Sequence, residues 1–464
     1  MSFSITSKND KKSAAHYPHI DSLPYDLLSV IFQFCLLNHR FGLTGMGKLP
    51  CAAPSNYEAP LLLMRVCRKW HDFALSTPTL WSRIAFGEGH TITVKPLLDN
   101  KMKEWLDRAG SVPLCIDFSE WTYLDASTQA AVDAALLDIF KPSRAWKMVF
   151  LQINGPTRSR CVDDILQAVL KRSPMLESFK CVFADPSDTL TLAPIEIGDT
   201  PCLTSLAIAS ESSKRRFYLS LSSIQFYNIR QLTLRLPVSN NHCLEILDRC
   251  PYVEVLDLNL KPKQEPWTRT CIQTLDNLHT LRIFSTTEEG VGNLIGGLST
   301  PALSSLTMKF RIPRYRGGSG WPHLTQLLAR SRPPLTSLAL IHSPMLDDDI
   351  IKCLQHCQAL TTLSGDRRLF TTEVMAALTP SFSPYKLPLC PAISTIRLEG
   401  IHHHFSAVVT MIHARWQISN ELLDDHEMKL QTVAVEVQQD YFLRFVQHRE
   451  IQECREGGMV IESF

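Results

Sequence analysis

Few residues in this sequence have the types and spacing that chemistry requires. The three histidines at 402–404 offer imidazoles, which are common metal ligands, but adjacent side chains point to different faces and no carboxylates cluster nearby. The three aspartates at 347–349 resemble an acidic cation patch, yet they directly precede two isoleucines. That position is typical of the negative first turn of a helix. We expect a solvated loop or a helix start for the histidines and a helix start for the aspartates.

The cysteines also lack the spacing of a metal site. Cys353 and Cys357 lie four apart, no Cys-x-x-Cys pair occurs, and no second pair follows at zinc spacing. Helix packing explains this pair better than metal binding. The chain has 14 cysteines, most of them in apolar surroundings, and no apolar leader. We therefore expect reduced, buried thiols in the cytoplasm and/or the nucleus.

Catalytic motifs are missing as well. The sequence has no Gly-x-Gly-x-x-Gly, no Walker-type phosphate loop and no Gly-x-Ser-x-Gly elbow. The glycine-rich stretch at 317–320 has no lysine after it in a strand-to-helix setting, so a flexible loop is the simpler interpretation. We expect no catalytic residue, no cofactor and no metal, and hence not an enzyme. An enzyme with a hidden site stays open as a rival, which a deep pocket with convergent polar groups would favour.

Bulk composition bounds the architecture. A chain of 464 residues exceeds one hydrophobic core, so two or more domains or a repeat array are expected. The net charge of +1 gives no electrostatic footprint for nucleic acid or membrane. Residues 1–19 are polar, with three lysines and no apolar stretch, so they predict a disordered segment rather than a signal peptide.

Two helices are predicted near the start. Pro24 suits a first helical turn, and Leu27, Leu28, Ile31 and Phe32 follow on one apolar stripe. The second helix carries Leu63, Val66, Cys67, Trp70 and Ala74 at helical spacing and ends at residues 76–78, before Leu80 and Trp81. The glycines and prolines in residues 37–59 predict a surface loop between the two. So small a unit buries its apolar surface only against something else.

This N-terminal pattern resembles an F-box over residues 20–86. The resemblance lies in Leu23-Pro24, the Ile31-Phe32 pair, the string Val66-Cys67-Arg68-Lys69-Trp70, and the closing Leu80-Trp81. It implies docking onto a Skp1-type adaptor, and through it a cullin, of a ubiquitin ligase. The implied adaptor-binding residues are Leu23, Pro24, Leu27, Leu28, Ile31, Phe32, Val66, Trp70, Leu80 and Trp81. Only some of them can touch the adaptor, because others must pack inside the motif. An ordinary helical cap packed on the rest of the chain is the alternative.

One phrase then recurs: an apolar residue, two variable ones, an apolar residue, one variable and an apolar residue. It begins at residues 176, 203, 229, 253, 278, 303, 335, 360, 393 and 430, and five successive intervals lie between 24 and 27. Met148-Leu151-Ile153 is expected to precede the series; Trp81-Ile84-Phe86 and Ser111-Leu114-Ile116 are candidate degenerate members. The last two apolar positions alternate as in a half-buried strand, and helix-like stretches ending at prolines lie between them. Such units bury their faces only by stacking.

The repeat resembles the leucine-rich repeat family as it occurs in F-box proteins. The expected fold class is therefore α/β: an N-terminal F-box helical motif followed by a curved leucine-rich-repeat-like α/β solenoid over residues 148–464, closed by a C-terminal cap. Residues 87–147 would be linking helices or degenerate first repeats. The asparagine or cysteine expected after the third apolar position is mostly missing.

Together the two resemblances imply the substrate-recognition subunit of a Skp1–cullin–F-box ubiquitin ligase. The solenoid would hold an unknown client protein, with contacts on its concave strand face and on the inserted loop after residue 310. Arg311, Arg314, Tyr315, Arg316 and Trp321 are the candidate client-binding residues, because arginine and aromatic side chains are enriched at interface hot spots. A scaffold that binds Skp1 or other partners without supporting ubiquitin transfer is the alternative.

Overall fold

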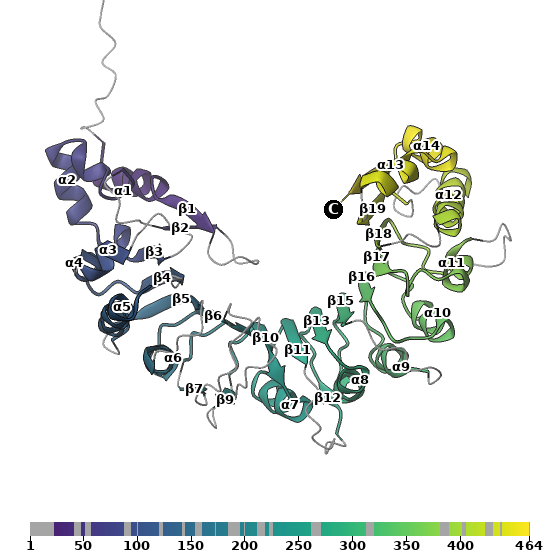
Figure 1. Ribbon diagram of the computed structural model, residues 1–464, viewed down its shortest axis with the longest axis horizontal. Helices are drawn as coiled ribbons and strands as arrows, with labels where there is room; N and C mark the ends of the chain where they lie inside the picture. The colour runs from purple at the N-terminus through teal and green to yellow at the C-terminus, as the bar shows by residue number, and fades with distance from the viewer. Residues whose placement is uncertain are drawn as a thin grey trace, which may run out of the picture. The chain divides into compact units, whose positions relative to one another are not determined.

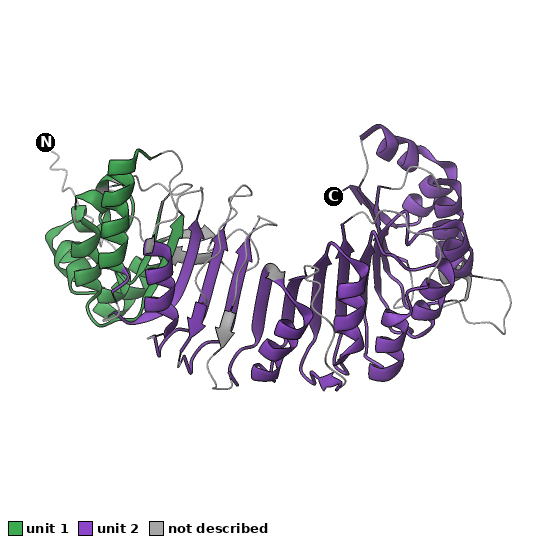
Figure 2. Cartoon of the chain, turned by 60° about the horizontal axis from the view of Figure 1, so that its bottom comes forward, with its two compact units in different colours: residues 1–139 green, residues 140–464 purple. Residues whose placement is uncertain are grey.

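The computed structural model describes residues 23–40, 48–51, 57–87, 94–99, 101–119, 124–141, 144–153, 160–171, 173–183, 195–198, 200–210, 219–221, 226–260, 271–311, 320–380, 389–400, 405–422, 430–436 and 439–463. The chain forms two compact units, unit 1 from Met1–Ile139 and unit 2 from Phe140–Phe464 (Figure 2). The expected disordered segment at 1–19 and the histidines at 402–404 lie outside the described residues. None of the described helices is long and apolar enough to cross a bilayer.

Unit 1 begins with helical elements and ends with strands and helices in alternation. Its elements are α1 (Tyr25–Phe34), β1 (Leu37–Arg40), β2 (Lys48–Cys51), η2 (Leu63–Arg65), α2 (Arg68–Leu75), η3 (Pro78–Leu80), β3 (Arg83–Gly87), α3 (Val94–Leu98), α4 (Lys101–Ala109), β4 (Leu114–Ser119) and α5 (Ala126–Ile139). Strands β3 and β4 pair in parallel. The first predicted helix is present as α1, and the later part of the second is present as α2, which ends at Leu75, as the sequence of residues 76–78 predicts.

The predicted loop between α1 and α2 is partly wrong. Strands β1 and β2 pair antiparallel, with Leu37 opposite Cys51 and Arg40 opposite Lys48. Glycines at 42, 45 and 47 exclude a helix here, but they are equally suited to the turn of a hairpin. Helix breakers alone therefore did not distinguish a loop from a hairpin.

Unit 2 is an α/β array of parallel strands. Its principal strands are β5 (Trp146–Ile153), β6 (Ser178–Phe183), β8 (Ser205–Ser210), β10 (Gln231–Val238), β11 (Val255–Leu260), β13 (Thr280–Ser285), β15 (Ser305–Phe310), β16 (Ser337–Ile341), β17 (Thr362–Asp366), β18 (Thr395–Glu399), β19 (Thr432–Glu436) and β20 (Val460–Ser463). They lie side by side in this order. Short strands β7 (Ile195–Ile197) and β9 (Leu219–Leu221) pair separately, as do β12 (Gln273–Thr274) and β14 (Leu298–Ser299).

Helices connect most of the strands of unit 2 and lie on one side of its sheet (Figures 1 and 2). They are α6 (Arg160–Lys171), α7 (Asn240–Arg249), α8 (Glu288–Gly296), α9 (His323–Ser331), α10 (Asp347–Gln355), α11 (Thr372–Leu378), α12 (Phe405–Leu422), α13 (Gln439–Gln447) and α14 (Arg449–Glu456). Within this unit the strands line the inner side of a curve and the helices the outer side. The layering follows from the repeat, because each strand and helix presents one apolar face to the space between them.

The recurring phrase maps onto the strands as predicted. Leu206, Leu232, Leu256, Leu281 and Leu306 occupy one register position on successive strands and are no more than 1% exposed. The strand closing the array is β20, which pairs with β19 and carries Ile461 opposite Val433. Parallel neighbours require a crossover after each strand. Helices supply it after β5, β10, β13 and each strand from β15 to β19, whereas the described part of the connections after β6, β8 and β11 holds only the short strands β7, β9 and β12.

Two early members of the repeat were placed wrongly. On β5, Val149 lies opposite Phe179 and Leu151 opposite Cys181, so the phrase begins at Trp146, two residues before Met148. On β4, Ile116 lies opposite Ile84, so its phrase begins at residue 113 rather than 111. A shift of two residues keeps the same face of a strand, and on each strand three successive residues of that face are apolar: Val149, Leu151 and Ile153 on β5, and Leu114, Ile116 and Phe118 on β4. The sequence therefore did not distinguish the two registers.

A ladder of hydroxyl groups fixes the start of many strands. The side chains of Thr204, Ser304, Thr336, Thr361 and Ser394 each donate to the carbonyl of the equivalent residue one strand earlier, over 2.9–3.4 Å. The same carbonyls accept backbone N–H groups, as Glu177 does from Thr204 and Ser205. These bonds satisfy backbone carbonyl groups at the edge of the sheet where the strands begin.

Candidate docking surfaces

Helix α1 of unit 1 has three distinct faces. Leu28 and Phe32 are fully buried, whereas Leu27, Val30 and Phe34 are exposed by 49%, 49% and 84%. Ile31 is partly exposed between them. Residues 27, 30, 31 and 34 follow the spacing i, i+3, i+4, i+7, which places them in one stripe along the helix. We call Leu27, Val30, Ile31 and Phe34 the α1 stripe.

The remaining face of α1 is polar and consists of Asp26, Ser29 and Gln33. An isolated surface helix needs only one apolar face, for its own core. Here the core face is occupied by Leu28 and Phe32, so the α1 stripe is a second apolar face, half exposed at Leu27 and Val30 and almost fully exposed at Phe34. Contiguous exposed apolar surface of this kind marks interaction sites in soluble proteins.

Aromatic contacts hold α1 to α2 from the core side. The ring of Phe32 lies 4.9 Å from that of Trp70 and 5.3 Å from that of Phe73, both edge to face. Tyr25 stacks on Phe73 at 5.3 Å, and the ammonium of Lys69 lies 5.5 Å from the centre of the Tyr25 ring. These contacts fix which way α1 is turned, and so keep the α1 stripe facing outward.

The ten residues predicted to bind the adaptor therefore divide into three sets. Pro24, Leu27 and Val66 are exposed, and Leu23 and Ile31 are partly exposed. The fully or nearly buried set is Leu28, Phe32, Trp70, Leu80 and Trp81. Only the first two sets present side chains to a partner. The buried set shapes the surface from beneath.

Trp81 joins the helical start of unit 1 to the rest of that unit. Its indole N–H donates to the carbonyl of Ala74 at 2.8 Å, its ring packs on Trp105 at 4.7 Å, and Arg108 lies 4.6 Å above it. The side chain is 0% exposed. Trp81 is therefore one of the residues that pack inside the motif rather than present a side chain to a partner, and its role is to anchor α2 against α4.

The segment before α2 differs from the single helix that was predicted. Cys67 is extended, with φ −158° and ψ 170°, and it separates the 3-10 turn η2 from α2. This break turns Val66 outward, where it is 55% exposed, while Leu63 stays buried. Leu62, four residues before Val66, is also exposed by 44%. The break thus adds two more exposed apolar side chains to unit 1.

Sequence reasoning missed Val30, Phe34 and Leu62 as surface residues. Their signal was present, because Val30 and Phe34 complete a helical stripe with Leu27 and Ile31. The sequence pattern placed Leu27, Leu28, Ile31 and Phe32 on one face, so the separate outward stripe was not predicted. Adjacent apolar residues in a helix are about 100° apart, so one pair belongs to the core and the other to the surface.

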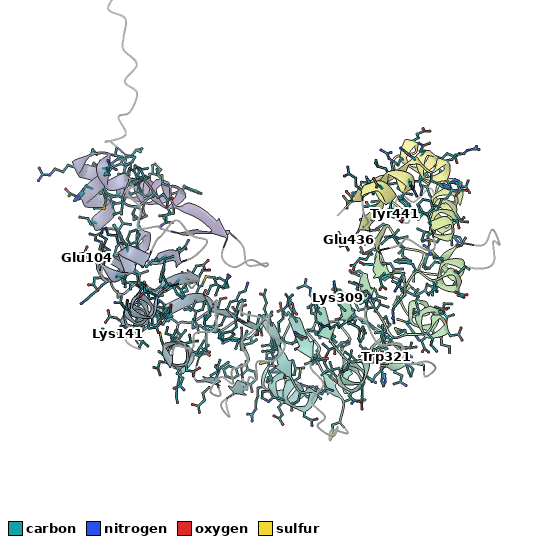
Figure 3. All side chains as sticks on the ribbon, viewed as in Figure 1. Glu104, Lys141, Lys309, Trp321, Glu436 and Tyr441 are labelled. Carbon is teal, nitrogen blue, oxygen red and sulfur yellow. The ribbon has the colours of Figure 1, made fainter. Side chains whose placement is uncertain are left out.

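The predicted client-binding residues are not brought together. Arg311 is exposed, whereas Arg314, Tyr315 and Arg316 lie outside the described residues. Trp321 is 6% exposed, its backbone N–H donates to Asp349 at 2.8 Å, and its ring packs on Phe310 and His323. Figure 3 places Trp321 among the helices on the outer side of unit 2. A role for Trp321 as an exposed hot spot is therefore wrong, because this ring packs α9 onto its neighbours.

The other candidate groups have structural roles. The three aspartates lie in the first turn of α10, where Asp349 binds Trp321 and Asp347 accepts from the hydroxyl of Thr371 at 2.9 Å. Cys357 donates its thiol to the carbonyl of Cys353 within the buried helix packing. Burial raises the pKa of the Cys243 and Cys250 thiols to about 12. No group of three or more His, Cys, Asp or Glu side chains suited to a metal occurs among the described residues.

Comparisons with known proteins leave the family open. No protein-family profile matches the chain, and no curated protein matches it. Among solved structures, the chain is similar to the crystal structure of a protein from Bacteroides fragilis, with 12% identity over 74% of this chain and 85% of the other. The TM-score of that match is 0.34, which is too low to carry an argument about fold or function.

Proposed function

We propose that this protein is the substrate-recognition subunit of a Skp1–cullin–F-box type ubiquitin ligase. Unit 1 binds a Skp1-type adaptor through the α1 stripe, and unit 2 holds a client protein. The observation that carries the proposal is the second apolar face of α1. A buried aromatic cluster fixes this face outward, and four apolar side chains in helical spacing present it to a partner.

The mechanism is proximity rather than chemistry supplied by this chain. A repeat array whose strands are locked to their neighbours is a rigid frame, and a bound client is then held near a ubiquitin-charged enzyme carried elsewhere in the assembly. Raised effective concentration accelerates transfer without a new nucleophile. The buried thiols of unit 2 fit this view, since their raised pKa keeps them protonated near neutral pH.

Capture of a purified Skp1-type adaptor by the full-length chain tests the proposal. Leu27→Asp with Ile31→Asp places two charges on the α1 stripe and is expected to abolish capture. The matched control is Ser29→Asp with Gln33→Asp, which adds the same two charges on the polar face of the same helix and is expected to leave capture unchanged.

The two pairs of variants separate docking from folding. Equal loss in both would mean that charge on α1 disturbs unit 1 as a whole, and equal capture in both would contradict the proposal. Co-purification of a cullin with the wild-type chain, and ubiquitylation of a bound protein, then decide between a ligase subunit and a scaffold that binds the adaptor alone.

A further inference from the structure

The sheet of unit 2 has one face turned away from its helices. On β13, Leu281 and Ile283 are buried toward the helices, so the alternation of the strand places Arg282 and Phe284 on the opposite face. The same alternation applies along the array, where Lys309 on β15 and Glu436 on β19 belong to this face. Figure 3 shows these two labelled residues on the inner side of unit 2. We call this surface the open sheet face.

A cationic patch lies on β13 and β15. Phe284 lies beside Lys309 in the parallel register, and the guanidinium of Arg235 lies 5.0 Å from the centre of the Phe284 ring. Arg235 is neutralised by Asp257, at 2.7 Å. Arg282 and Lys309 are exposed, and among the described residues neither has an ion-pair partner within 4.0 Å. Arg282 lies opposite Asp257 in the parallel register, but Arg235, Arg282 and Lys309 outnumber that one carboxylate, so the patch around the half-buried Phe284 ring is net positive.

An acidic row follows on β17, β18 and β19. Asp366, Glu399 and Glu436 occupy one register position on these three strands. Asp366 is buried and pairs with His342 at 2.5 Å, whereas Glu399 is partly exposed and Glu436 is exposed. Between the patch and the row lies β16, whose residues on this face are Ser337, Ala339 and Ile341. Arg397 on β18 also lies on this face, two residues before Glu399, so negative charge predominates on β17–β19 without excluding positive charge, and positive charge predominates on the far side of the uncharged β16.

We propose that the open sheet face binds a protein segment of mixed charge, with carboxylates on Arg282 and Lys309 and cationic side chains on Glu399 and Glu436. This inference rests on the proposed function, because it names the chemistry of the client. Arginine beside an aromatic ring is typical of interface hot spots. Charges of opposite sign at the two ends fix the direction of the segment and reject one that is reversed.

The same pattern argues against a nucleic acid as the ligand. A cation–aromatic patch alone suits single-stranded nucleic acid, whose bases stack on aromatic rings. A polyanion long enough to extend from the cationic patch on β13 and β15 to the acidic row would lie close to the carboxylates of Glu399 and Glu436 and be repelled by them. The net charge of the chain, +1, supplies no long-range attraction to overcome that repulsion.

The strand spacing sets the length of a suitable probe. Lys309 and Glu399 lie on strands three steps apart, or about 14 Å at the usual separation of neighbouring strands. Roughly four residues of extended chain span that distance. A labelled peptide with two glutamates, a spacer of about four serine and glycine residues, and two lysines therefore matches the open sheet face.

Fluorescence anisotropy with the full-length chain tests the proposal at low and at physiological ionic strength. The block peptide is expected to bind saturably, and more tightly than a peptide of the same composition with alternating Glu and Lys. Arg282→Glu with Lys309→Glu is expected to weaken binding by at least about tenfold, with a similar loss for Glu399→Lys with Glu436→Lys. Lys101→Glu with Lys352→Glu, two exposed lysines outside this face, is the charge-matched control and is expected to bind normally.

Several results would overturn the inference. They are no saturable binding of the block peptide, equal loss in the control variant, or a single-stranded DNA of similar length binding as tightly. Failure of the proposed function is distinguishable, because the patch variants retain adaptor capture and Leu27→Asp with Ile31→Asp retains peptide binding. If the wild-type chain binds the peptide but does not capture the adaptor, the ligase role is contradicted and the inference about the open sheet face is not.

Discussion

Leu369 fills the space beside Gly365 on β17. Neighbouring strands carry leucine at this position, Leu340 on β16 and Leu398 on β18, and both are buried. A Cβ on Gly365 would overlap the Leu369 side chain and lie 2.7 Å from the carbonyl oxygen of Leu340. Leu369, in the turn after β17, therefore takes the place in the core that a leucine of the strand occupies on the neighbouring strands. This substitution explains why the repeat beginning at residue 360 lacks its third apolar residue.

Gly365→Ala is expected to destabilise unit 2 by about 1–3 kcal/mol, as overpacking of a core does. Thermal or urea unfolding of the full-length chain measures the loss. Gly296→Ala on α8 is the control, because a Cβ there meets nothing within 4 Å and alanine favours a helix. A Gly365→Ala chain as stable as wild type would show that Leu369 moves aside freely.

Trp321→Ala is expected to lower the free energy of unfolding by about 3–5 kcal/mol, because it leaves a cavity between Phe310 and His323. Trp321→Phe should cost less, because it keeps the ring and loses only the contact of the indole N–H with the carbonyl of Glu288. Denaturant unfolding compares the three chains. If Trp321→Ala is as stable as wild type, the conclusion that Trp321 packs in the core of unit 2 is contradicted.

Glu399 links stability to pH. Burial raises the pKa of its carboxyl, the charges of Glu436 and Asp366 act in the same direction, and Lys309 and His342 oppose them. A raised folded-state pKa means that stability is greatest below the ordinary value of 4.5 and falls as the pH rises through the folded-state pKa. Near neutral pH, Glu399→Gln is therefore expected to have a higher melting temperature than wild type. This difference in melting temperature is expected to vanish well below pH 4.5. A constant difference across that range would contradict this account.

The start of unit 2 depends on Trp146. This side chain is 0% exposed, occupies the first apolar position of its repeat, and stacks on Phe140 at 4.9 Å. A chain beginning at Lys147 is expected to melt at a lower temperature, and less cooperatively, than one beginning at Phe140. Superimposable melting curves of the two truncated chains would reject the role of residues 140–146.

The periodic part of the fold was predictable because burial imposes it. Leu281 and Ile283 are buried and alternate with exposed or partly exposed neighbours, at a spacing that recurs, and the helices between strands end near prolines. Prediction failed where another residue supplied the missing apolar group, as Leu369 does for Gly365. It also missed α12, whose Val408, Val409, Met411 and Ile412 are buried but whose start lies beside the three histidines.

The candidate site was predictable in its residues but not in its orientation. Sequence pattern identified Leu27, Leu28, Ile31 and Phe32 as apolar, yet which pair faces outward depends on where Trp70 and Phe73 lie. The charges of the open sheet face were beyond sequence reasoning for the same reason. Asp366, Glu399 and Glu436 are more than thirty residues apart in the chain, and only the parallel register brings them together.

The affinity of the full-length chain for a purified Skp1-type adaptor, measured by calorimetry, tests the central claim most directly. Phe34 is 84% exposed, so Phe34→Ala should leave the melting temperature unchanged. We predict saturable binding by wild type and a loss of about tenfold or more in Phe34→Ala, as for a large apolar side chain buried at an interface. No binding by wild type, or the same affinity in both chains, would contradict the account.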